Sequence, residues 1–179
     1  MKGVCSALLK LLCSEVVVST RGGIRIDEKS SRHAKCLSVS IKNCTGTKIV
    51  VDLDRYGQFS QYINEHHAEA NKSCDAVVFC TYKKRNFMIF VELKSDNPGA
   101  WRKQLKNSER FVGYLCTLLE THHGVDTAGF EKVFFLCTTR NTMKKTVCVQ
   151  KKLEPLEDCP EKCFILPCNE SIYLDNLNL

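Results

Sequence analysis

The chain has 179 residues and a mass of 20.3 kDa, and its 44% hydrophobic content is enough to fill one core. Charged residues make up 26% of the chain, proline and glycine are few, and no run of eighteen apolar residues occurs. These values argue against a disordered chain, a fibrous protein and a membrane-spanning helix, and they predict one domain over residues 1–179.

The net charge of +6 is unevenly distributed along the chain. Residues 153–179 contain six acidic residues and one lysine, so this segment carries −5 and residues 1–152 carry +11. A body this basic attracts polyanions such as nucleic acid, although solvated basic faces without a partner would give the same excess. We therefore expect a nucleic-acid partner and no membrane partner.

Residues 1–57 read as an N-terminal extension that contains a helix and a hairpin. Lys10 interrupts the first apolar run, which predicts an amphipathic helix rather than a signal peptide. Alternating residues at 36–42 and 47–53 flank the Thr45-Gly46 turn and predict two strands paired as a hairpin. A short helix is expected next, at 58–70, with an apolar stripe that includes Tyr62.

Residues 75–82 and 87–94 predict a second hairpin, joined by a turn at residues 83–86. The period of two places Glu92 and Lys94 on one face, and the opposite face, which holds Val91, is expected to pack under a helix. If the turn is centred between positions 84 and 85, Asp75 lies opposite Lys94, whereas a two-residue shift places it opposite Glu92. Either register gathers the three polar side chains on one face.

A long helix is expected after this hairpin. Asp96 or Asn97 could cap its start, with Pro98 in the first turn, and Gly124 could end it. Apolar residues from Trp101 onward follow at helical spacing. Strands at 132–138, 146–150 and 163–166 would complete an α/β order.

Asp75, Glu92 and Lys94 form a chemically sensible set. Two carboxylates can hold Mg²⁺ or Mn²⁺, which keeps waters and accepts phosphate oxygens, and a neighbouring ammonium can orient an attacking water. The alternative is a salt-bridged sheet edge. The triplet at 27–29 has a similar composition, but it lacks a preceding Asp-headed strand and a following capped helix, so it ranks lower.

Asp75 in SCDAVVF, the strand FVELK with Glu92 and Lys94, and a following helix with Gln104 resemble the active-site core of the PD-(D/E)XK nuclease superfamily. The resemblance covers about residues 58–138. It implies a restriction-endonuclease-like fold, with a central mixed β-sheet flanked by helices in αβββαβ order. It also implies Asp75 and Glu92 as metal ligands and Lys94 as the catalytic lysine. Cys74 stands where the proline of the motif is expected.

Further residues could complete such a site. Many members add an acid from the helix before the Asp strand, for which Glu65 and Glu69 are candidates, although both fit an ordinary helix surface. Gln104 matches part of the Gln-x-x-x-Tyr pattern of the exonuclease branch, but position 108 is serine. Basic side chains that could contact phosphates lie in the turn and on the long helix: Lys83, Lys84, Arg85, Arg102, Lys103, Lys106 and Arg110.

Twelve cysteines are present, and several, such as Cys80 and Cys137, sit in apolar runs typical of core thiols. This pattern favours a reducing, intracellular setting. Cys159, Cys163 and Cys168 could hold Zn²⁺ or an iron–sulfur cluster with a fourth ligand, or they could be unligated thiols of the acidic segment 153–179.

Three functions follow from these patterns. The first is a divalent-metal-dependent nuclease that hydrolyses phosphodiester bonds, with DNA favoured over RNA and a homodimer as a possible state. The second is a nuclease-fold protein with an idle site that binds nucleic acid or acts as a scaffold. The third is a cysteine-based metal or redox module.

Overall fold

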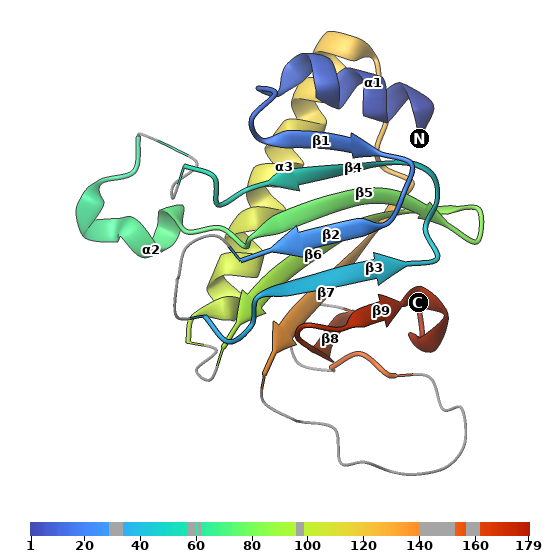
Figure 1. The fold of residues 1–179 in the computed structure, drawn as a ribbon. Coiled ribbons are helices and arrows are strands. Elements are labelled where there is room, and N and C mark those ends of the chain that lie inside the picture. Colours follow the sequence, from blue (N-terminus) through green and yellow to red (C-terminus); the bar gives the residue numbers. More distant parts are fainter. Residues whose placement is uncertain (29–33, 57–59, 61, 96–98, 140–152, 157–161) are drawn as a thin grey trace.

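A mixed sheet forms the middle layer of the structure, a computed structural model that describes residues 1–28, 34–56, 60, 62–95, 99–139, 153–156 and 162–179 (Figure 1). Its strands, in chain order, are β1 (Val17–Thr20), β4 (Thr45–Asp52), β5 (Ala76–Tyr82), β6 (Arg85–Lys94), β7 (Phe130–Thr138) and β8 (Cys163–Pro167). They lie side by side in this order. The first four pair antiparallel, whereas β6, β7 and β8 pair parallel.

Helices α1 (Lys2–Leu11) and α3 (Trp101–His123) cover one face of this sheet (Figure 1). Apolar residues of both helices form one core cluster with Phe79, Phe90 and Leu136 of the sheet. The short α2 (Ala68–Asn71) follows a 3-10 turn (Glu65–His67) and lies beside α3. No helix among the described residues is long and apolar enough to cross a membrane.

A second, three-stranded sheet covers the opposite face. It contains β2 (Ile24–Asp27), β3 (Ser38–Lys42) and β9 (Ser171–Tyr173), and a 3-10 turn (Leu174–Asn176) follows it. Its inward side chains pack on the other face of the six-stranded sheet in a second core cluster. Strands β5, β6 and β7 are therefore buried on both faces along most of their length, which explains their nearly continuous apolar sequences.

This arrangement confirms the mixed α/β class and a central mixed sheet. The strands expected at 75–82, 87–94, 132–138 and 163–166 are present as β5, β6, β7 and β8. The long helix ends at Gly124, which has a φ of 60° and donates its N–H to the carbonyl of Glu120. The strand expected at 146–150 lies outside the described residues.

The hairpin expected between 36–42 and 47–53 is wrong, although both strands exist. β3 pairs with β2 and β9, whereas β4 pairs with β1 and β5. Left-handed φ angles at Asn43 (71°) and Gly46 (66°) redirect the chain between the two sheets. Alternating burial fits either pairing, because each strand has one inward face, so the sequence pattern did not distinguish them.

Three smaller expectations are also corrected. Among the described residues of the 58–70 region, helical structure is confined to the 3-10 turn and α2. The long helix begins at Trp101 after Ala100, so neither Asp96 nor Asn97 is its N-cap, and residues 96–98 lie outside the described part. The β6 face that holds Val91 packs against the second sheet, and α3 covers the Glu92 face instead.

The β5–β6 hairpin turns on two residues. Lys83 and Lys84 have φ angles of 47° and 64°, which is the left-handed geometry of a tight type I′ turn. Consequently Ala76 pairs with Val91, and Asp75, one residue earlier, comes level with Glu92. Of the two registers considered from the sequence, the structure has the one shifted by two residues.

A disulfide joins Cys36, before β3, to Cys168, after β8. The expectation of unligated thiols in the C-terminal segment is therefore wrong for Cys168. The link spans 132 residues of sequence, so it restricts the unfolded chain strongly.

We expect Cys168→Ser to lower the free energy of unfolding by about 2–5 kcal/mol, because it removes this restriction. Urea denaturation of the non-reduced protein measures the change. Cys13→Ser, which alters an exposed free thiol, is the matched control and should leave stability within about 0.5 kcal/mol of wild type. Equal midpoints for the two variants would show that the bond does not stabilise the fold.

Candidate functional site

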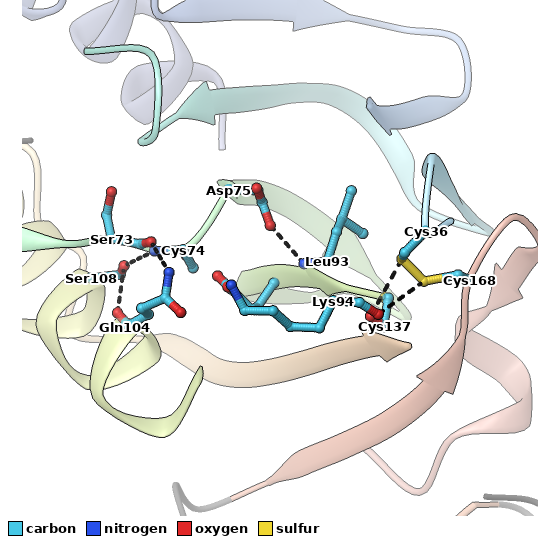
Figure 2. A network of polar contacts seen from close by, with 11 residues as sticks. Cys36, Ser73, Cys74, Asp75, Leu93, Lys94, Gln104, Ser108, Cys137 and Cys168 are labelled. Atoms are coloured by element: carbon cyan, nitrogen blue, oxygen red, sulfur yellow. Dashed lines mark hydrogen bonds and ion pairs between the residues drawn. A yellow bond between two sulfur atoms is a disulfide. The ribbon is translucent and has the colours of Figure 1, made fainter. Parts of the chain in front are cut away.

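Asp75 lies at the N-terminal end of β5, where the backbone ladder with β6 is about to end. Its carboxylate Oδ2 accepts a hydrogen bond of 2.6 Å from the backbone N–H of Leu93 (Figure 2). Its own carbonyl accepts from the N–H of Leu53, which follows β4. The Asp75 side chain thus bonds to the neighbouring strand β6, which fixes it beside the strand that carries Glu92.

Glu92 and Lys94 lie on the β6 face covered by α3. Glu92 is 1% exposed, and its Oε1 forms an ion pair with the ammonium of Lys94, whose side chain is 25% exposed. The other oxygen, Oε2, is buried and has no hydrogen-bond partner among the described residues. A buried carboxylate oxygen without a donor is costly and marks a position where a ligand could be favourable.

The protonation of these groups reflects their burial and proximity. Burial raises the pKa of Asp75 to about 7, against the lowering effect of the Leu93 hydrogen bond. Burial, and then repulsion by Asp75, raises the pKa of Glu92 to about 8. Burial alone would lower the pKa of Lys94, but attraction to Glu92 outweighs it and the pKa lies above its usual value. Two carboxylates thus compete for protons near neutral pH.

Helix α3 holds the backbone that leads into Asp75. The N–H of Cys74 donates to the hydroxyl of Ser108 at 2.7 Å, and that hydroxyl donates to the carbonyl of Gln104 (Figure 2). The Gln104 amide donates in turn to the carbonyl of Ser73 at 3.1 Å. Gln104 therefore positions the Asp75 segment, and the serine at position 108, which departs from the exonuclease pattern, has a structural role.

Asp54 and Glu28 were not selected from the sequence, yet both act electrostatically on the site. Each raises the pKa of Asp75, and burial together with Asp52 and Glu28 raises the pKa of Asp54. Glu28 belongs to the Asp-Glu-Lys triplet at 27–29, which the sequence made a weaker candidate for a metal site than Asp75, Glu92 and Lys94. The signal for Asp54 is its position just after β4, because β4 pairs with β5 and brings the two strand ends together.

A cavity of about 610 Å³ opens beside Asp75, between the six-stranded sheet and β2. Its lining includes Val18 and Val50 of the central sheet and the acidic residues Asp52, Asp54 and Asp75. It lies on the sheet face opposite α3, so it is separate from the side on which Glu92 and Lys94 project.

The other expected acids and bases are distributed over three places. Glu69 forms an ion pair of 3.2 Å with Lys103 between α2 and α3, and the side chain of Glu65 lies outside the described part. On α3, the guanidinium of Arg102 lies over the Trp101 ring, whereas a groove next to α2 is lined by Lys103, Lys106 and Arg110.

The turn bases lie at the far end of the hairpin from Asp75, and two of them already have acidic partners. Lys83 pairs with Asp175 at 3.6 Å, and Arg85 pairs with Glu131. Lys84 is exposed. The structure therefore does not bring this cluster to the candidate site.

The C-terminal cysteines are not gathered into one site. Cys163 lies in the core beneath the helices, whereas Cys168 lies on the other side of the sheet and is bonded to Cys36. Cys159 lies outside the described residues. More generally, no group of three or more His, Cys, Asp or Glu side chains is placed to hold a metal ion in the part of the chain that the structure describes.

The arrangement therefore offers two carboxylates and an ammonium rather than a complete protein cage. Two carboxylates suit Mg²⁺ or Mn²⁺, because such ions are often bound through one or two carboxylates plus waters and substrate phosphates.

The comparisons give no relative: no protein-family model matches the chain, and no curated protein or solved structure is similar enough to count as a match.

We expect Ser108→Ala to lower the free energy of unfolding by about 1–2 kcal/mol, because it leaves the buried N–H of Cys74 without an acceptor. Urea denaturation measures this loss. Thr117→Ala is the matched control, since the Thr117 hydroxyl also donates to the carbonyl four residues earlier in α3 but is exposed. Equal losses in the two variants would contradict a supporting role for Ser108.

The raised pKa values predict a dependence of stability on pH. Between about pH 4.5 and 8 the folded protein binds more protons at Glu92 than the unfolded chain, so stability falls as pH rises. The loss should be on the order of 2–5 kcal/mol in wild type. Glu92→Gln should flatten this decline in urea titrations across that range, whereas the exposed control Glu120→Gln should keep it. A decline that Glu92→Gln leaves unchanged would contradict the burial argument.

Proposed function

We propose that the chain is a divalent-metal-dependent nuclease that hydrolyses phosphodiester bonds, with Asp75, Glu92 and Lys94 as its working residues. The observation that carries the proposal is the buried Oε2 of Glu92, which has no hydrogen-bond donor among the residues that the structure describes, while a second, partly buried carboxylate, Asp75, acts electrostatically on Glu92. A divalent cation would compensate the negative charge of both carboxylates, Asp75 and Glu92.

The order of elements supports the same proposal. Helix α1, strands β4, β5 and β6, helix α3 and strand β7 occur in the order αβββαβ, with β1, β2 and β3 inserted after α1 and the 3-10 turn and α2 inserted between β4 and β5. This is the order that the resemblance to the PD-(D/E)XK superfamily implies. On this interpretation the core runs from α1 to β7 and is wider than residues 58–138.

Asp75 and Glu92 would hold the metal, which would polarise the phosphate and lower the pKa of a bound water. The ammonium of Lys94 would orient the attacking water and offset charge at the phosphorus. For this role Lys94, whose side chain is partly exposed, would have to leave the Oε1 of Glu92. Gln104 and Ser108 keep Asp75 in place through the backbone before it.

A second candidate is a nuclease-fold protein with an idle site that binds nucleic acid. The observation in its favour is that Glu92 is 1% exposed and already paired with Lys94, as in a structural ion pair. Eight of the described cysteines are free thiols and several lie in the core, which favours an intracellular setting for both candidates, whereas the Cys36–Cys168 disulfide is typical of an oxidising one. A cysteine-based module receives no comparable support.

The nuclease proposal predicts cleavage of linear, circular or single-stranded DNA in the presence of Mg²⁺ or Mn²⁺. Asp75→Asn, Glu92→Gln and Lys94→Ala should each reduce the rate by about a hundred-fold or more, since each removes charge from the reacting centre. Lys84→Ala, at the other end of the hairpin, should cleave like wild type. Equal rates in all these proteins would mean that the activity comes from elsewhere.

Metal binding can be measured without cleavage. At pH 8 we expect Mn²⁺ to raise the melting temperature of wild type, because a cation bound only by the folded state stabilises it. Glu92→Gln should lose this increase, and Glu120→Gln should retain it. If Mn²⁺ stabilises wild type and no substrate is cut, the idle-site candidate gains support. If Mn²⁺ has no effect on wild type, the metal assignment is wrong.

A further inference from the structure

A groove of about 620 Å³ separates α2 and its preceding 3-10 turn from the outer face of α3. The α3 wall carries Lys103, Lys106 and Arg110, whose spacing of three and four residues places them in one stripe. The opposite wall carries His66 and His67, both exposed. One wall is therefore cationic, and the other presents two imidazole rings.

The two walls are fixed relative to each other by side chains that bridge them. The Asn107 amide of α3 donates to the carbonyls of Glu69 at 2.9 Å and Lys72 at 3.1 Å. Lys103 pairs with the Glu69 carboxylate across the same gap, which neutralises the acid that lines the groove. A ligand would therefore enter a groove that is already formed, and little ordering cost would oppose binding.

Lys106 and Arg110 have no ion-pair partner within the described ranges. They are four residues apart on a helix, so their backbones are separated by about 6 Å along its axis. Two uncompensated cations held at a fixed spacing on a rigid helix suit a ligand with regularly spaced negative charges, such as a chain of phosphates.

A short segment of backbone links this groove to the candidate site. The segment from Lys72 to Cys74 joins α2 to Asp75, and Gln104, next to Lys103 on α3, binds this segment. Groove and Glu92 lie on the helix-covered side of the sheet, whereas the cavity on the other side is rimmed by acidic residues such as Asp54, which would repel a phosphate chain.

We propose that the groove between α2 and α3 binds one single strand of nucleic acid, with the phosphates against Lys106 and Arg110 and unstacked bases against His66 and His67. This deepens the proposed function and rests on it for the class of substrate. A single strand fits because imidazole rings can stack on bases that are splayed out, whereas a duplex keeps its bases stacked inside.

The test is fluorescence anisotropy with a short labelled single-stranded DNA in EDTA, so that neither metal nor cleavage contributes. Lys106→Glu/Arg110→Glu should weaken binding by about ten-fold or more and reduce the slope of log affinity against log salt by roughly 1.4. The double variant Lys2→Glu/Lys10→Glu, which changes the charge equally at exposed sites on α1, should change affinity less than about three-fold. His66→Ala/His67→Ala should weaken binding several-fold with the slope nearly unchanged.

The inference is overturned if reversing the two charges in the groove weakens binding no more than the control double variant does. It is equally overturned if duplex DNA binds as tightly as the single strand. It is also overturned if poly-glutamate competes as well as unlabelled single strand, which would indicate an acidic protein partner. Because the assay contains no divalent ion, its failure is separate from failure of the nuclease. If the wild type cleaves DNA but Lys106→Glu/Arg110→Glu binds the single strand like wild type, only the inference about the groove is wrong. If this variant loses binding and the wild type does not cleave DNA, only the nuclease proposal is wrong.

Discussion

The burial of Glu92 beside Asp75 is the constraint on which the site depends. A carboxylate on the helix-covered face of a central strand loses its water, and Lys94 compensates one of its oxygens only. Asp75 does not relieve this situation, because its partly buried carboxylate repels that of Glu92. The fold accepts this cost at a single place on β6, between apolar residues that are almost fully buried, and such local costs are typical of functional sites.

The rest of the molecule keeps these groups in position. β6 is central because it pairs with β5 on one side and with β7 on the other, and layers of helices and strands cover its two faces. α3 starts soon after β6, crosses the sheet, and returns two polar side chains, Gln104 and Ser108, to the backbone before Asp75. Strand β6, the helix α3 that follows it and the start of strand β5 are thus held together as one structural unit.

Much of this unit follows from local sequence rules. Alternation in FMIFVELK gives a strand with Glu92 and Lys94 on the same face, and the spacing from Trp101 to Gly124 gives the helix. What local rules cannot supply is which strands become neighbours. The pairing of β4 with β5 brings Asp54 to the site, but the alternation of apolar and polar residues in β4 fits a hairpin with β3 equally well. The identity of the layer above each face of β6 is likewise a tertiary property, so the prediction that Val91 packs under a helix was wrong.

The two sides of the central sheet differ in charge near the candidate site, and this difference would determine from which side a polyanion approaches. On the helix side, Lys106 and Arg110 have no ion-pair partner in the part of the chain that the structure describes and line a groove, whereas the cavity on the opposite side is lined by carboxylates. The turn bases do not alter this contrast, because Asp175 and Glu131 compensate two of them. A polyanion would therefore be attracted to the helix side of the sheet, where Glu92 and Lys94 project, and repelled from the side of the acidic cavity.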